Sequence, residues 1–293
     1  MRPLRRIDES CLPIELCELV IDNIDRKHTL RACRLACRAF LPASSRRLFY
    51  HVDLGDRDTA ERFLHIICSV PSPTSPCRYV RKLCLNEGRR REVENRWINK
   101  ALPLLTERLL EVTILELKFL RWNLLDSIGR TAILSSFLKV QSLEMIFGKF
   151  ESSEQINQFI ASFPSLVDLY CSQNQWEIDG PLTAALPQGL RTIALDSYHS
   201  PFFHHLLRRE LRPGVRALRF HYMFREDTKS VGMLLKILGS SLEELHFGSL
   251  HYALGDGQCD AEGQPFRSSM IFNVTLLFFM LFSRVQERYQ SCS

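Results

Sequence analysis

The sequence predicts an α/β protein in which a short helical module is followed by an irregular array of repeated units with parallel strands. Three helix-type apolar stripes lie within residues 12–50, short alternating apolar runs recur through residues 79–254, and helix-like segments separate several of these runs. The chain of 293 residues, with 45% hydrophobic and 24% charged residues, has the size and composition of a folded protein with a sizeable core.

The helical module is expected over residues 8–54. Its first apolar stripe covers residues 16–24 and its second covers residues 30–40. Pro42 should end the second helix or start a third over residues 43–50, because proline has no N–H for a helix interior. Three helices in so short a segment make too small a core to be very stable alone. We therefore expect the module to depend for its stability on packing against a partner or against the rest of the chain.

A connecting segment follows the module over residues 55–78. Residues 51–54 alternate as a strand does and lead into this segment, and residues 58–70 form an amphipathic helical pattern. The run of proline and serine at residues 71–76 then predicts a turn-rich link.

The repeated runs of residues 79–254 predict a solenoid. In each Leu-x-Leu run the two apolar side chains point to one face of a strand, so stacked units bury a ladder and the middle residues line the outer, concave sheet. The steps between runs, 32, 28, 26, 24, 25 and 27 residues, mostly fit leucine-rich repeats with a strand and a helix per unit. A non-repetitive α/β domain is the alternative. The register residues are Leu83, Leu115, Leu143, Leu169, Ile193, Leu218 and Leu245. Helices are expected between strands, at residues 153–162, 200–211 and 228–238.

A family resemblance rests on motifs in the module. A Leu-Pro-x-Glu-Leu start at residues 12–16 is followed by Val-Ile-Asp-x-Ile at residues 20–24, by Thr-Leu-x-x-Cys-x-Leu-Ala-Cys-Arg-x-Phe at residues 29–40 and by Leu-Phe at residues 48–49. In this order the motifs resemble the F-box, in the form found in many fungal F-box proteins. The likeness covers about 40 residues of the 293-residue chain, and an F-box followed by leucine-rich repeats is a familiar layout of that family.

The resemblance implies an adaptor, not an enzyme. The module would dock on a Skp-type adaptor and through it on a cullin, so that the chain becomes the substrate-recognition subunit of a cullin–RING ubiquitin ligase whose array binds a target protein. Ala36 stands where the family usually has Val, which would weaken docking by about 1–2 kcal/mol if the position is buried. The alternative is an interaction scaffold outside any ligase. The adaptor-binding residues carried over from the family are Leu12, Pro13, Leu16, Ile21, Leu30, Leu35 and Phe40.

No motif for catalysis or for a cofactor is present. The sequence lacks GxxxxGK[ST], GxGxxG, HExxH and GxSxG, so we expect no catalytic residue, no cofactor and no metal. Cys33 and Cys37 are four residues apart, but further zinc ligands are missing nearby, and the ten scattered cysteines indicate buried thiols of a reducing compartment. Together with the lack of an apolar stretch behind the first arginines, this predicts an intracellular protein, cytoplasmic or nuclear.

Two charged patterns leave alternatives open. Glu116, Glu144, Asp168 and Glu244 recur at the strands, either as solvated positions on the outer sheet or as an acidic stripe for a basic partner. The basic residues of 89–100 suit a solvated loop or a contact with phosphate or an acidic surface. A formal net charge of +5 is mild, so we expect no nucleic-acid partner.

The last segment, residues 255–293, breaks the repeat rhythm. Its run of 13 uncharged residues, 270–282, is shorter than the roughly 20 residues that a membrane-spanning helix needs, so no membrane partner is expected. The run is interpreted as a buried last strand or helix of the array, as an anchor at a membrane surface, or as a stretch outside the natural reading frame. The first and last interpretations are favoured over the anchor.

Overall fold

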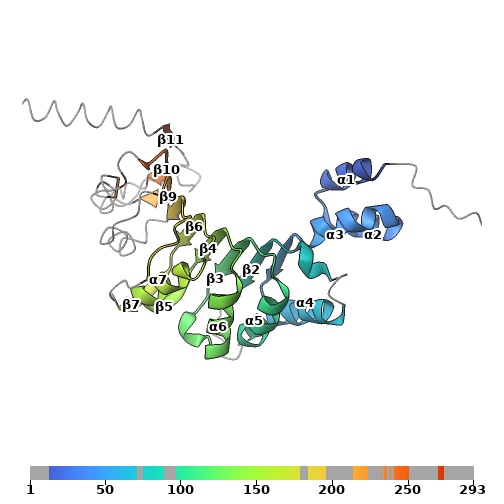
Figure 1. Cartoon of the computed structure of the whole chain (residues 1–293), viewed down its shortest axis with the longest axis horizontal. Coiled ribbons are helices and arrows are strands. Elements are labelled where there is room, and N and C mark those ends of the chain that lie inside the picture. Colours follow the sequence, from blue (N-terminus) through green and yellow to red (C-terminus); the bar gives the residue numbers. More distant parts are fainter. Residues whose placement is uncertain are drawn as a thin grey trace, which may run out of the picture.

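The computed structural model describes residues 13–70, 75–88, 97–178, 184–195, 214–223, 241–250 and 270–273, together with 232, 234, 235 and 238. Figure 1 shows a helical module at one end, followed by a sheet whose strands run in chain order, with helices on one side. The predicted α/β class is confirmed, and the sheet is mostly parallel.

Three helices and a short 3-10 turn form the module, and their number and order follow the three apolar stripes. Their core is small: Ile21, Leu30 and Ala43 are buried, and partly buried side chains including Phe40 and Leu48 pack around them. A core of this size contributes little stability by itself. The elements are α1 (Ile14–Asp22), α2 (Lys27–Ala36), η1 (Arg38–Phe40) and α3 (Leu41–Phe49).

The module joins the sheet directly. α3 ends at Phe49, and strand β1 (His51–Leu54) begins two residues later. The carbonyl of Tyr50, between them, accepts hydrogen bonds from the backbone N–H of Arg81, at 3.0 Å, and of the residue after it, at 2.9 Å. The ring of Phe49 packs against the main core. The last helix of the module is therefore fixed to the sheet by backbone bonds and by apolar packing.

The main sheet has nine strands, and their order is β1-β2-β3-β4-β6-β8-β9-β10-β11. All neighbours pair in parallel except β10 and β11, which pair antiparallel. All seven predicted array runs form strands of this sheet. The strands after β1 are β2 (Lys82–Asn86), β3 (Ile114–Lys118), β4 (Ser142–Ile146), β6 (Asp168–Ser172), β8 (Thr192–Leu195), β9 (Ala217–Met223), β10 (Glu244–Leu250) and β11 (Met270–Asn273).

The register of the pairing confirms the predicted ladder. Leu83 pairs with Leu115, Leu115 with Leu143, and the series continues through Leu169, Ile193 and Leu218 to Leu245 without a slip. Every one of these side chains is at most 1% exposed. A slip of one residue would turn all of them to the opposite face, so burial of the ladder fixes the register.

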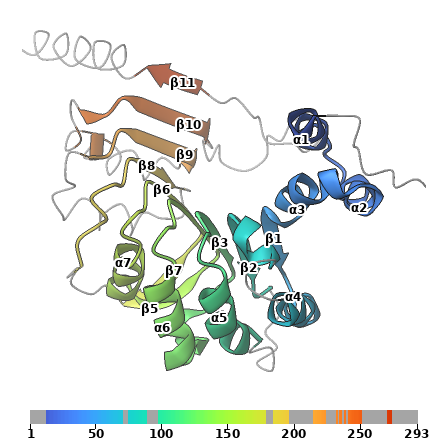
Figure 2. The same ribbon diagram turned by 45° about the vertical axis from the view of Figure 1, so that its right-hand side comes forward.

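Four helices cover the side of the sheet onto which the ladder points. Figure 2 shows them on the outer side of the curved sheet, with the module at its β1 end. Helix and strand side chains together form one continuous apolar core from Val52 to Leu245. The predicted helices at residues 58–70 and 153–162 are confirmed within a residue at each end. The helices are α4 (Arg57–Ser69), α5 (Trp97–Arg108), α6 (Ser127–Ser136) and α7 (Ser153–Ala161).

A second, small sheet departs from the prediction. Strands β5 (Lys149–Ser152) and β7 (Gln175–Ile178) pair in parallel, and they follow β4 and β6 where only loops or helices were expected. They alternate too briefly to stand out as strands, since each is only four residues long.

Several predicted features lie outside the described residues. These are Leu12, the arginines of residues 89–91, the helix at residues 200–211, most of that at 228–238, and the tail beyond residue 273. The start of the apolar tail forms β11, the antiparallel partner of β10. In the part of the chain that the structure describes, no helix has the length and apolar character to cross a membrane.

Candidate protein-interaction surfaces

Helix α1 has apolar side chains beyond the side that it buries. Cys17 and Ile21, four residues apart, point into the module core and are buried. Leu16, Leu19 and Val20 have the spacing of a second face, and they remain 45%, 58% and 48% exposed. We call these three residues the outer stripe of α1. The apolar surface of α1 thus extends well beyond the side that packs in the module, so the outer stripe is a candidate contact surface.

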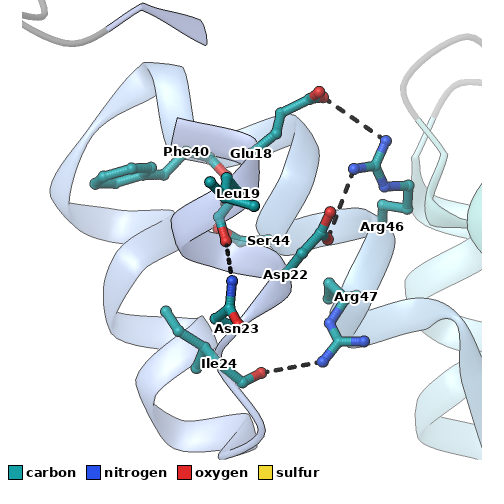
Figure 3. Close-up of polar contacts among 9 residues, drawn as sticks. All are labelled: Glu18, Leu19, Asp22, Asn23, Ile24, Phe40, Ser44, Arg46 and Arg47. Carbon is teal, nitrogen blue, oxygen red and sulfur yellow. Dashed lines mark hydrogen bonds and ion pairs between the residues drawn. The ribbon is translucent and has the colours of Figure 1, made fainter. Parts of the chain in front are cut away.

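Two arginines of α3 make polar contacts with α1 and with the turn that follows it. Arg46 lies 3.7 Å from a carboxylate oxygen of Glu18 and 3.8 Å from one of Asp22. Arg47 donates a hydrogen bond to the carbonyl oxygen of Ile24, at 3.3 Å, just beyond the end of α1 (Figure 3). Exposed ion pairs of this kind contribute at most about 1 kcal/mol each. They orient α1 so that its acidic flank meets α3 and its outer stripe faces away.

The structure divides the predicted adaptor-binding residues into two groups. Pro13, Leu16 and Leu35 are exposed, Leu35 at 88%, and Pro13 directly precedes α1, where its carbonyl accepts the N–H of Leu16 and of the next residue. Ile21 and Leu30 are 0% and 3% exposed, so they belong to the core of the module and not to its surface, which corrects their place in the set. Phe40 is partly buried against that core, and Leu12 lies outside the described residues. Leu19 and Val20 are additional surface residues that the predicted adaptor-binding set did not include.

The second candidate surface is the sheet face opposite the ladder. Its central row consists of the middle residues of the runs, which pair across the strands as the ladder does. No described helix covers this face (Figure 2). We call it the open face, with its central row Asp53, Cys84, Glu116, Glu144, Tyr170, Ala194, Arg219 and His246.

Ion pairs neutralise much of the acidic charge on the open face. Lys118 Nζ lies 2.5 Å from one carboxylate oxygen of Glu116, and Lys82 Nζ lies 3.1 Å from the other. Lys82 also reaches Glu144 at 3.4 Å, and Arg219 pairs with Glu244 at 3.1 Å. Glu116 is only 6% exposed, so it is neither a solvated position nor a free anion for a partner. Both sequence-based interpretations of the acidic residues are therefore wrong for Glu116.

The network shifts the ionisation of its members. Burial acts to raise the pKa of Glu116, but hydrogen bonds from Lys118 and Lys82 outweigh it, and the pKa lies below its ordinary value. Beside this carboxylate, burial together with the negative charges of Glu116 and Asp53 raises the pKa of the Cys84 thiol to about 12. A thiol with so high a pKa stays protonated at neutral pH and is a poor nucleophile.

Acid should therefore weaken the fold through Glu116. The stability from its ion pairs is present above the ordinary pKa of about 4.5 and is lost as the pH falls through the lowered pKa of the folded state. We expect Glu116→Gln to reduce the pH dependence of the unfolding free energy below about pH 4.5, by at most about 1.4 kcal/mol per pH unit. Urea unfolding at a series of pH values measures this slope.

The control is Leu117→Val on the same strand, which removes a buried methylene group but no titrating group. It should lower stability equally at every pH and keep the wild-type slope. An unchanged slope in Glu116→Gln would show that the buried carboxylate does not govern acid sensitivity.

Asn174 was not singled out by the sequence, and it links two neighbouring units. It is 5% exposed and follows β6. Its side-chain oxygen accepts the backbone N–H of Gly148 at 2.8 Å, and its amide donates to the carbonyl of Met145 at 3.1 Å. In the sequence, Asn174 is a single asparagine three residues after Cys171, the second apolar residue of its run. Because the other runs are not followed by an asparagine at the same spacing, the residue did not stand out.

The described residues include surface cavities and free thiols. No group of three or more His, Cys, Asp or Glu side chains among them is arranged to hold a metal ion. A cavity of about 290 Å³ between α4 and α5 is lined by Trp97 and Leu64 and by Arg57 and Glu61, which pair with each other at 2.6 Å. The described cysteines are free thiols; Cys17, Cys77, Cys84 and Cys171 are buried and Cys68 is exposed.

Comparisons with known proteins add no identification: no protein-family model matches the chain, and no curated protein matches its sequence.

Proposed function

We propose that this chain is a substrate-recognition adaptor of a cullin–RING ubiquitin ligase. Helices α1–α3 act as an F-box that binds a Skp-type adaptor, and the array acts as an irregular leucine-rich repeat solenoid that binds a target protein. The chain itself breaks no bond, and the ligase chemistry belongs to its partners.

The observation that carries the proposal is the outer stripe of α1. Leu16, Leu19 and Val20 expose aliphatic surface on a module whose own core of buried apolar side chains, among the described residues, is small. Burying each of these side chains against a partner would contribute roughly 1.5–3 kcal/mol before the costs of association. A partner that covers the stripe thus supplies the apolar burial that the module lacks.

Two further observations support the array as a recognition surface. The strands stack in one register with units of similar length, as in a solenoid whose units contact mainly their neighbours. Asn174 bonds to the backbone of the preceding unit in the way that a repeat asparagine holds adjacent turns together. The open face would then present to a bound target those members of its central row that are exposed or partly exposed, which are Asp53, Glu144, Tyr170, Arg219 and His246.

The test is binding of the full chain to a purified Skp-type adaptor. Leu16→Asp combined with Val20→Asp should raise the dissociation constant at least ~100-fold, because two apolar contacts are lost and two charges are desolvated. Isothermal titration calorimetry measures the constant, and circular dichroism checks that the variant stays folded. Both positions are exposed, so folding should be unaffected.

A matched control places the same charges on exposed apolar residues elsewhere. Ile128→Asp with Leu138→Asp changes side chains that are 64% and 53% exposed, and this pair should bind as the wild type does. If the wild type does not bind the adaptor, or if the α1 variant binds equally well, the ligase role is wrong. An interaction scaffold outside any ligase then becomes the better account.

A further inference from the structure

The part of the module from α2 to α3 carries positive charge only. Between Asp25 and Asp53 the chain contains no Asp or Glu but seven Lys or Arg. This number exceeds the formal net charge of the whole chain, +5, so the remainder of the chain is slightly acidic on balance. The seven cations are Arg26, Lys27, Arg31, Arg34, Arg38, Arg46 and Arg47.

Among the described residues, two of these cations form ion pairs. Arg46 and Arg47 pair with acidic residues of α1 and of the turn that follows it. For the other five, no ion pair is found among the described residues. Lys27, Arg31 and Arg34 are spaced four and three apart on α2, so they lie along one side of the helix, and all three are exposed. We call them the basic stripe of α2.

The basic stripe is electrostatically unfavourable in the isolated chain. Like charges three and four residues apart on a helix repel each other. Lys27 also stands in the first turn, where the helix dipole disfavours a cation, and that turn contains no acidic residue. The guanidinium of Arg34 lies 5.6 Å from the ring centroid of Phe49. A negatively charged partner would remove this repulsion.

We infer that the protein partner of the module covers the basic stripe of α2 with an acidic surface while it covers the outer stripe of α1 with an apolar one. Leu35, next to Arg34 and four residues after Arg31, is 88% exposed and continues the apolar contact onto α2. This inference deepens the proposed function and rests on it: the Skp-type adaptor is the partner, and it must carry carboxylates beside its apolar groove.

A protein fits these surfaces better than a membrane does. Helices that lie on membranes combine basic residues with large apolar and aromatic ones on a single helix. Here the main apolar stripe and the basic stripe lie on different helices, and Leu16, Leu19 and Val20 are all aliphatic.

Opposite charges at the edge of an interface mainly speed association, and salt screens them. We therefore expect Lys27→Gln with Arg31→Gln to lower the association rate constant of the full chain for the purified Skp-type adaptor about 10-fold at low ionic strength. The dissociation rate should change less than about 2-fold. Near 1 M salt, where the screening length is about 3 Å, the two proteins should associate at similar rates. Stopped-flow fluorescence across a salt series measures these rates.

The matched control is Lys100→Gln with Arg108→Gln, which removes the same charge from exposed positions of α5 and should leave association unchanged. If the wild type binds the adaptor and the α2 variant associates equally fast, the inference fails while the ligase role stands. If the wild type does not bind, both fail. A third arm uses vesicles of phosphatidylcholine with phosphatidylserine: binding that depends on Lys27 and Arg31 there, without any effect on the adaptor, would assign the basic stripe to a membrane and overturn the inference.

Discussion

Replacing Leu143 by alanine is expected to lower the free energy of unfolding by about 3–4 kcal/mol. Leu143 is 0% exposed and pairs with Leu115 on one side and Leu169 on the other, in the middle of the ladder. Truncation removes apolar burial and leaves a cavity that neighbouring strands, held in register, cannot close. Urea denaturation should show a lower midpoint with an unchanged slope.

The control for this prediction is Leu138→Ala, which makes the same chemical change at a side chain that is 53% exposed. It should cost less than about 1 kcal/mol, because little burial is lost. Equal losses in the two variants would mean that the ladder is not the core that holds the array together.

Replacing Asn174 by alanine is expected to cost about 2–4 kcal/mol. The substitution removes two hydrogen bonds to buried backbone groups, one from the N–H of Gly148 and one to the carbonyl of Met145. Each unsatisfied buried group costs about 1–3 kcal/mol. Thermal and urea unfolding measure the loss, and Asn23→Ala, which removes one exposed hydrogen bond to the carbonyl of Leu19, should cost below about 1 kcal/mol.

A second substitution tests the same contact from the other side. A Cβ at Gly148 would lie 2.6 Å from the side-chain oxygen of Asn174, so Gly148→Ala must displace the bonded asparagine. In the double variant, Gly148→Ala with Asn174→Ala, the clash with the asparagine oxygen is absent. The loss of unfolding free energy in the double variant should therefore be smaller than the sum of the losses in the two single variants. Additive losses would show that Gly148 and Asn174 do not act through each other.

The strands and their register could be predicted because they depend on local alternation. A Leu-x-Leu run places two side chains on one face wherever it occurs, and seven such runs at similar spacing leave one consistent way to stack them. The turns after the strands could not be predicted in this way. Phe119 and Phe147 both adopt φ of 57°, which costs an ordinary residue about 1–2 kcal/mol, and their rings stack with centroids 4.8 Å apart. Nothing in the local pattern distinguishes a phenylalanine in this conformation from one in a strand.

The candidate surfaces were predicted only in part, for a physical reason. The spacing of apolar residues in α1 identifies a helix, but it does not tell which side packs on α3 and which remains open. Ile21 and Leu16 therefore looked equivalent, although one is buried and the other exposed. The pairing of Lys82 and Lys118 with Glu116 needed the strand register, because these residues lie on two neighbouring strands.

The direct passage from α3 into β1 has a mechanical consequence. Tyr50 is the only residue between the two elements. Its carbonyl accepts hydrogen bonds from the backbone N–H of Arg81, which precedes β2, and of Lys82, the first residue of β2. No stretch of free backbone is left there to act as a hinge. The orientation of the module therefore fixes the orientation of the sheet. A protein bound to α1 and a protein bound to the open face would be held at a fixed distance and angle from each other.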